Sequence, residues 1–164
     1  MEKLERIKAK ILTRDQIRAQ RNVWYFKEKK VVFTNGCFDL LHLGHIEYLS
    51  KAADLGDVLV IGLNSDSSVR KLKGEGRPLM NEYARAMVLS SLSFVTAVIL
   101  FNEETPYDLI AGVKPDVLVK GADYEIGQIA GYDLVQAHGG TVVTIPLTEG
   151  YSTSGIIEKL RPHG

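Results

Sequence analysis

The sequence predicts an α/β fold in which helices cover both faces of a doubly wound, five-stranded parallel sheet. Five short apolar runs, rich in β-branched residues and without polar alternation, recur between helical stretches. Strands that are buried on both faces have this appearance, and the β-α-β-α order favours a parallel sheet. The expected strands are 31–33, 58–61, 97–100, 117–119 and 142–145.

Helix start signals separate several of these runs. Ser65 before Asp66, and Asn81 before Glu82, are residue types that cap helix N-termini. Thr105 followed by Pro106 fits a cap with proline at the first helical position. Ligands in such folds bind beyond the carboxyl ends of the strands, where the winding reverses. Functional residues are therefore expected directly after the strands.

Residues 1–30 differ from the rest and are expected to form an N-terminal helical extension of one or two amphipathic helices. Thr13 and Gln16 have the spacing of a capping box. The aromatic cluster 24–26 is interpreted as packing or an oligomer contact rather than a base-stacking surface. Residues 31–164 are expected to form one domain.

Composition limits the classes of function. The chain has 164 residues, with 20 Lys and Arg against 20 Asp and Glu, which argues against broad binding to nucleic acid or to an anionic membrane. One cysteine cannot form an internal disulfide, and no apolar run approaches the roughly 18 residues of a membrane span. We expect an enzyme of the cytoplasm.

The segment 34–45 directly follows the first expected strand and carries the richest chemistry. His42 and His45 lie three positions apart, with Gly44 between them, at the start of an expected helix. Both imidazoles would share one helix face, where free N–H groups and the helix dipole attract anions. Glycine lets a phosphate approach the backbone closely. The pattern therefore predicts a cradle for phosphate oxygens.

Other interpretations of this segment are weaker. The glycine patterns of P-loops and dinucleotide-binding folds are absent. A zinc site is disfavoured because no Glu lies between the histidines and the one cysteine is upstream. Cys37 as a nucleophile would need an adjacent, oriented base, so a packed role is preferred. His138 and His163 are interpreted as incidental.

Two motifs in this order resemble a known family. The sequence His42-Leu43-Gly44-His45 resembles the H-x-G-H signature of nucleotidyltransferases that share a Rossmann-like fold with class I aminoacyl-tRNA synthetases. The block 147–154, expected after the fifth strand, is similar to the R-T-E-G-I-S-T-T block of cytidylyltransferases. Its leading arginine is Leu147 here, so no role of that guanidinium carries over.

Further segments resemble the D-glycero-β-D-manno-heptose 1-phosphate adenylyltransferases, a family often joined to a sugar kinase in one bifunctional protein. The resemblance covers about residues 31–160 and implies transfer of AMP from ATP to the sugar phosphate, giving ADP-heptose and pyrophosphate for lipopolysaccharide core synthesis. It also implies Mg²⁺ bound with ATP and a homodimer. The segments are 32–39, 64–66, 72–74, 77–78 and 119–124.

The motif and the resemblance together assign candidate site residues. His42, His45 and Lys73 are expected to be catalytic, stabilising charge on the phosphates. Asp39 could also position the triphosphate or its metal, and we assign no protein ligand to a metal. Expected substrate-binding residues are Lys71, Arg77 and Arg85. Expected nucleotide-binding residues are Asn35, Gly36, Cys37, Phe38, Asp39, Gly44, Lys120, Asp123, Ser152, Thr153 and Ser154.

Three alternatives stay open at this point. One is a cytidylyltransferase acting on an alcohol phosphate such as glycerol 3-phosphate, and another is an FAD synthetase of archaeal type. The third is a regulatory nucleotide-binding module without catalysis. The sequence fixes neither the nucleobase nor the sugar, and it does not fix the protonation of the histidines.

Overall fold

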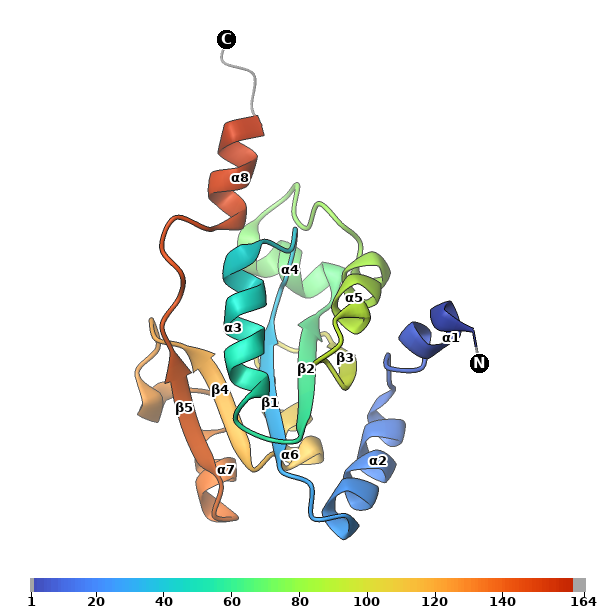
Figure 1. Ribbon diagram of the computed structural model, residues 1–164. Coiled ribbons are helices and arrows are strands. Elements are labelled where there is room, and N and C mark those ends of the chain that lie inside the picture. Colours follow the sequence, from blue (N-terminus) through green and yellow to red (C-terminus); the bar gives the residue numbers. More distant parts are fainter. Residues whose placement is uncertain (1, 161–164) are drawn as a thin grey trace.

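The computed structural model describes residues 2–160 and is built on one five-stranded parallel sheet of order β3-β2-β1-β4-β5 (Figure 1). Each predicted strand is present, extended by a residue or more. The predicted fold class is therefore confirmed. The strands are β1 (Val31–Gly36), β2 (Val58–Asn64), β3 (Ala97–Phe101), β4 (Val117–Gly121) and β5 (Thr141–Ile145).

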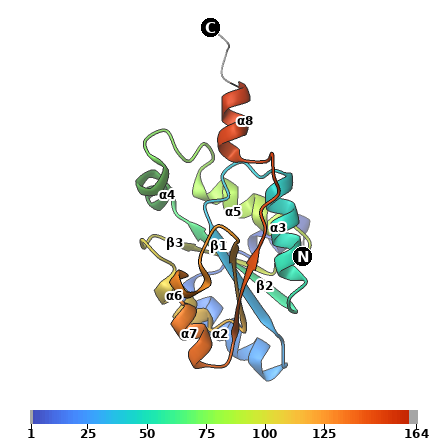
Figure 2. The same cartoon turned by 90° about the vertical axis from the view of Figure 1, so that its left-hand side faces the viewer.

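Helices cover both faces of this sheet, giving three layers (Figure 2). One apolar core lies between the sheet and the helices α3 (Leu43–Ala53) and α5 (Glu82–Ser91). The other lies beneath α2 (Arg14–Phe26), α6 (Tyr107–Val113) and α7 (Tyr132–Ala137). Alternate strand residues feed the two cores, which explains why the strand sequences show no polar alternation. The remaining helices are α1 (Lys3–Lys8), α4 (Asp66–Lys73), the short 3₁₀ helix η1 (Ile126–Gln128) and α8 (Thr153–Leu160).

The predicted helix caps are present, with one shift. The Ser65 side chain accepts a hydrogen bond from the Ser68 N–H, and Asn81 does the same for α5. Helix α6 begins one residue later than expected, because Pro106 takes the N-cap position and Tyr107 the first turn. Proline fixes the backbone there without supplying a side-chain cap.

The N-terminal extension contains two helices, as predicted, and it packs into the rest of the molecule. Ile17 and Trp24 are buried in the core beneath α2, whereas Phe26 is 87% exposed. Between the two helices, the backbone pairs with the outer edge of β3, since the Leu12 N–H donates to the Val98 carbonyl at 2.9 Å. The boundary at residue 30 stays a prediction.

The point where the winding reverses lies between β1 and β4. These strands pair only at Val32–Val117 and Phe33–Leu118, although β1 runs on to Gly36 and β4 to Gly121. Their carboxyl ends therefore diverge, and this fork is where an open α/β sheet binds its ligands. Helix α8 stands beyond this end of the sheet (Figure 1).

Candidate functional site

The loop that leaves β1 enters the fork in a constrained conformation. Phe38 and Leu40 have φ angles of 44° and 55°, in the left-handed region that side chains with a Cβ seldom adopt. Such residues persist only where the surrounding structure holds them, and they cluster at functional sites. The loop delivers the chain to His42, the N-cap residue of α3.

The two histidines form a stacked pair at the start of α3. Their ring centroids are 3.8 Å apart with an angle of 21° between the planes, and the Phe38 ring meets His45 edge-on at 5.4 Å. The His42 side chain caps no backbone N–H group. The sequence spacing predicted that the imidazoles share one face, and the structure confirms it.

The pair leaves polar atoms without a partner in the protein. Within residues 2–160, Nδ1 of His42, Nδ1 of His45 and Oδ1 of Asn35 are buried and make no hydrogen bond. Asn35 lies near the end of β1, so all three atoms belong to the segment that connects the end of β1 to the start of α3. Buried polar groups are nearly always paired, and unpaired ones at a fork of this kind suit a polar ligand.

Both imidazoles are neutral at physiological pH. Burial lowers the pKa of His45 to about 4, with a smaller contribution from the adjacent His42. Burial also lowers the pKa of His42. A neutral imidazole donates one N–H, so each ring offers a hydrogen bond rather than a positive charge. Burial thus favours the neutral form of both rings, which the sequence alone could not indicate.

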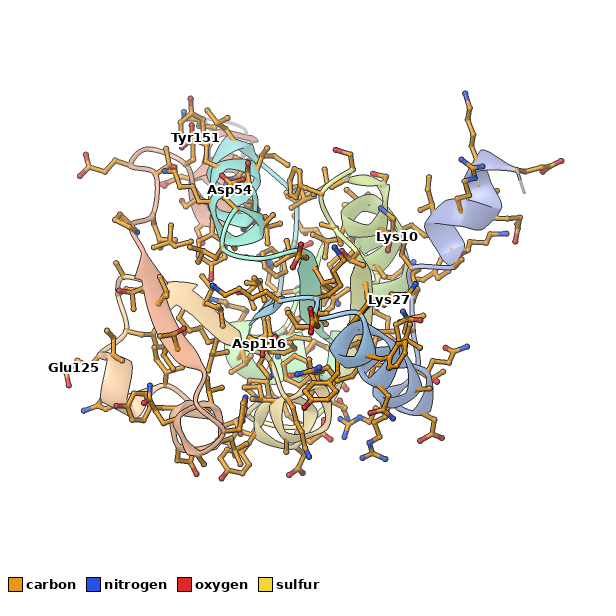
Figure 3. The ribbon with its side chains drawn as sticks, turned by 60° about the horizontal axis from the view of Figure 1, so that its bottom comes forward. Lys10, Lys27, Asp54, Asp116, Glu125 and Tyr151 are labelled. Atoms are coloured by element: carbon orange, nitrogen blue, oxygen red, sulfur yellow. The ribbon has the colours of Figure 1, made fainter. Side chains whose placement is uncertain are left out.

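Gly44 makes close packing possible at the helix start. A Cβ placed on it would lie 3.2 Å from the His42 ring and 3.3 Å from Cβ of Tyr151. Tyr151 precedes α8 and lies beside α3 (Figure 3). The glycine thus lets the loop before α8 approach the histidine pair, in addition to its predicted approach to phosphate.

Asp39 has a different environment from the one expected. Its side chain is 1% exposed, and Oδ2 accepts hydrogen bonds from Nε of Arg77 and from the Leu79 N–H, each at 2.9 Å. Oδ1 accepts the Met80 N–H at 3.1 Å. Burial would raise the pKa of Asp39, but these hydrogen bonds outweigh it and hold the pKa below its usual range. An enclosed, occupied carboxylate does not support the expected contact with the triphosphate or its metal.

Arg85 is also enclosed. Its side chain is 0% exposed, and it donates to the Cys37 carbonyl at 2.6 Å, the Met80 carbonyl at 3.0 Å and Oδ1 of Asp66 at 2.8 Å. All three guanidinium nitrogens are engaged inside the protein. This arrangement argues against the expected contact with the sugar phosphate, which needs an accessible guanidinium.

The cationic segment after β2 lies open to solvent. Lys71 and Lys73 are exposed in the last turn of α4, and Gly74 and Gly76 follow with positive φ angles. Lys73 lies near enough to Cys37 to favour its thiolate, yet burial dominates and raises the pKa of that thiol. Cys37 is therefore a protonated, partly buried residue, which fits the packed role assigned to it.

On the β4 side of the fork, Lys120 is partly buried. Its ammonium lies 5.3 Å from the centroid of the Tyr124 ring. Burial lowers the pKa of Lys120 to about 8, against the opposing effect of Asp123. Desolvation strengthens any contact that this cation makes with an anion.

The start of α8 combines internal and exposed groups. Oγ of Ser152 accepts the Gly155 N–H at 3.0 Å, so Ser152 acts as a local cap. Oγ1 of Thr153 donates to the Asp39 carbonyl at 2.8 Å, and Ser154 is exposed. The predicted helix N-terminus is present, and its phosphate contacts stay a prediction.

Two polar contacts near the site were not predicted. The hydroxyls of Thr34 and Tyr48 are 2.8 Å apart and buried, and burial raises the pKa of Tyr48 to about 12. Thr148 donates to Glu47 at 2.5 Å, joining the loop before α8 to α3. Only the position of Thr34 directly after an expected strand could have signalled its role.

Other hollows in the molecule lie away from this site. A cleft of about 640 Å³ is lined by Arg21, Tyr25 and Phe26 together with charged neighbours, and a second of about 600 Å³ lies between α2 and α6. Within residues 2–160, no group of three or more His, Cys, Asp or Glu side chains is arranged to hold a metal ion. Nor is any helix there long and apolar enough to cross a membrane. His163 lies outside the described residues.

A family model described as cytidylyltransferase-like matches residues 33–159. This chain belongs to that family. This match confirms the predicted resemblance to cytidylyltransferases and the nucleotidyltransferase class of enzyme. The cytidylyltransferase-like region includes every candidate site residue, from the end of β1 to the start of α8.

Curated relatives of this cytidylyltransferase-like chain include the bifunctional protein HldE of Syntrophotalea carbinolica, 51% identical over 93% of this chain and 31% of its own length. HldE of Citrifermentans bemidjiense is 57% identical over 80% of this chain and 27% of its own. The chain thus spans about a third of these relatives.

Solved structures agree with the fold. The lipopolysaccharide core biosynthesis protein of Thermoplasma volcanium is 31% identical, with a TM-score of 0.60, over 76% of this chain and 99% of its own. The pantoate-β-alanine ligase of Francisella tularensis matches with a TM-score of 0.66 at 18% identity, over 93% of this chain and 73% of its own, which shows the fold alone.

Proposed function

We propose that the protein transfers AMP from ATP to D-glycero-β-D-manno-heptose 1-phosphate, giving ADP-heptose and pyrophosphate for lipopolysaccharide core synthesis. The observation that carries the proposal is the identity of 51% and more to HldE, since the family resemblance implied one half of such a bifunctional protein. The lipopolysaccharide core biosynthesis protein of Thermoplasma volcanium supports the same pathway.

The chemistry needs no protein nucleophile. An oxygen of the sugar phosphate attacks the α-phosphorus of ATP, the bond from that phosphorus to the α,β-bridging oxygen breaks, and pyrophosphate leaves with the electron pair. The protein's task is to position the two anions and to stabilise the charge that develops. Neutral His42 and His45 donate N–H groups to phosphate oxygens, while Lys73 supplies positive charge.

The remaining candidates divide between the two substrates. Ser152, Thr153 and Ser154 would hold the terminal phosphates of ATP at the start of α8. Lys71 and Arg77 would face the sugar phosphate. Nucleotide contacts are proposed for the β1 loop, apart from the enclosed Asp39, and for Lys120 and Asp123 on the β4 side of the fork.

Magnesium would accompany ATP rather than occupy a protein site of its own. Asp39, the buried carboxylate in the β1 loop, already accepts three hydrogen bonds. Within residues 2–160, no group of three or more His, Cys, Asp or Glu side chains could hold a metal ion. Mg²⁺ commonly keeps water and substrate phosphates as ligands. When bound in this way it neutralises phosphate charge and orients the triphosphate.

An acceptor screen tests the proposal. Purified protein is incubated with ATP or CTP and with the β-heptose 1-phosphate, its α-anomer, glycerol 3-phosphate or FMN, and pyrophosphate release is measured. Release is expected only from ATP with the β-anomer. Release from CTP with glycerol 3-phosphate would establish the cytidylyltransferase alternative, and ATP binding without release from any acceptor would indicate a regulatory module.

The proposal extends to the setting of the enzyme. We propose a homodimer in the cytoplasm, where ATP and sugar phosphates are available. The exposed aromatic side chains of Tyr25 and Phe26, 74% and 87% accessible, suit a subunit contact. Light scattering on the eluting protein checks the mass of the assembly.

A further inference from the structure

Two buried groups of opposite charge meet at one residue of the segment after α4. The Met80 N–H donates to Asp39, and the Met80 carbonyl accepts from Arg85. Each charged group then reaches further. Asp39 also binds Arg77 and the Leu79 N–H. Two side chains with almost no contact with solvent thus hold the segment 77–80 at three backbone groups and at the Arg77 side chain.

Arg85 also holds the loop that leads to His42, to which Asp39 itself belongs. Arg85 donates to the Cys37 carbonyl, immediately before the left-handed Phe38. It also binds Asp66, the first residue of α4, whose last residue is Lys73. Arg85 therefore joins the β1 loop to the helix that ends in the candidate catalytic lysine.

Asp39 brings in the third phosphate-binding element. Its carbonyl accepts the Thr153 hydroxyl at the start of α8, while its carboxylate holds Arg77. Along the chain, Asp39 is 38 residues from Arg77 and 114 residues from Thr153. The β1 loop, the cationic segment and α8 converge on this one residue.

We propose that Asp39 and Arg85 are positioning residues, which fix the segment carrying Lys73 and Arg77, and the start of α8, relative to the histidine pair without touching a substrate. Directional hydrogen bonds to buried charges specify one arrangement better than apolar contacts, which tolerate sliding. Catalysis by positioning is sensitive to small displacements, so loosening this network lowers turnover. The kinetic part of the proposal rests on the proposed function; the structural part does not.

The test compares Asp39→Asn with Asp116→Asn. Asp116 is a matched control because it also accepts a backbone N–H, from Val31 at 2.7 Å, and faces an arginine, Arg21 at 3.8 Å. It lies at the opposite end of the sheet, near α2 (Figure 3). The folded protein is digested briefly with trypsin, and the rate of cleavage after Lys71 and Lys73 is measured. Cleavage is expected to be at least about tenfold faster in Asp39→Asn and unchanged in Asp116→Asn.

Kinetics then separate positioning from contact. Asp39→Asn is expected to lower kcat about a hundredfold while the Mg²⁺ concentration for half-maximal rate stays the same. Arg85→Lys keeps the charge but loses the fork of donors, so kcat is expected to fall with the KM for the sugar phosphate unchanged. A shifted Mg²⁺ requirement, or a raised sugar-phosphate KM, would establish direct contact and overturn the proposal.

Unaltered trypsin cleavage together with unaltered kcat in Asp39→Asn would overturn it as well. Should that variant not fold, amide exchange of the wild-type protein decides: slow exchange at Leu79 and Met80 supports the network, and exchange as fast as at Gly76 contradicts it. The digestion and exchange readouts need no substrate. If the wild-type protein released no pyrophosphate from any acceptor, the proposed function would fail while these readouts still tested the network.

Discussion

The helices α2 and α3 differ in how the N–H groups of their first turns are hydrogen-bonded. At α2, Oγ1 of Thr13 accepts the Gln16 N–H, and Oε1 of Gln16 accepts the Thr13 N–H at 2.8 Å. At α3, the N-cap residue is His42, whose side chain makes no such bond. At every helix start the first N–H groups lack a partner within the helix backbone, and the helix dipole places a partial positive charge there.

The difference indicates what each helix start is for. A helix that only packs gains stability by satisfying its own first turn, and α2 does so. Helix α3 forgoes that gain, which leaves its N–H groups and the imidazole nitrogens to a ligand. The other described histidine supports the contrast, since Nε2 of His138 lies 2.8 Å from the Pro115 carbonyl.

The largest expected effect comes from truncating the pair. His42→Ala and His45→Ala should each lower the rate of pyrophosphate release by about a hundredfold, because loss of one preorganised donor costs about 3 kcal/mol of transition-state stabilisation. Circular dichroism should show that both variants stay folded. His138→Ala, with its internal partner, is the control and should keep the wild-type rate. Wild-type turnover in either variant of the pair would remove that residue from its role.

An intermediate effect concerns stability and pH. The pKa of folded His45 is about 4, whereas an unfolded histidine titrates near 6.5. Between these values the unfolded chain binds more protons, so the free energy of unfolding should decrease as the pH falls from about 6.5 to about 4. Urea unfolding at pH 7.5 and pH 5 measures this, with His45→Gln as the reference. Equal losses of stability in the two proteins would show that His45 is not responsible.

The smallest expected effect is at α2. Thr13→Ala removes the capping box and should lower the free energy of unfolding by about 1 kcal/mol. Turnover measured well below the melting temperature should not change, because the helix start is occupied only by its own residues. A loss of turnover without a loss of stability would mean that the two helix starts do not differ in the way described.

Local sequence patterns were sufficient for the sheet and for the starts of several helices. Runs such as Val58-Leu59-Val60-Ile61 have one plausible placement, between two helical layers, and short caps such as Ser65 act within a few residues. The pairing of residues 10–12 with β3 was not predicted, because a segment of three residues that includes a lysine has no recognisable strand pattern. That contact depends on tertiary placement alone.

The candidate site likewise has features that local sequence predicts and features that depend on tertiary structure. The histidine pair and its helix could be predicted because spacing and a glycine determine them. The neutral state of His45 could not, since it depends on burial by residues that include Phe38. The environments of Asp39 and Arg85 could not be predicted, for a related reason. A charged residue in a functional motif suggests contact with a charged substrate, and only the three-dimensional structure shows that both are enclosed by backbone groups.

Of the two outer strands of this sheet, β3 and β5, one is already paired along its outer edge. The backbone at Lys10 and Leu12 already occupies the margin of β3, whereas β5 is hydrogen-bonded along one flank only, within residues 2–160. A strand supplied by another polypeptide would therefore join beside Thr141–Ile145, and ordered stacking of copies through their sheets, whether adaptive or an aggregation hazard, would have to begin there.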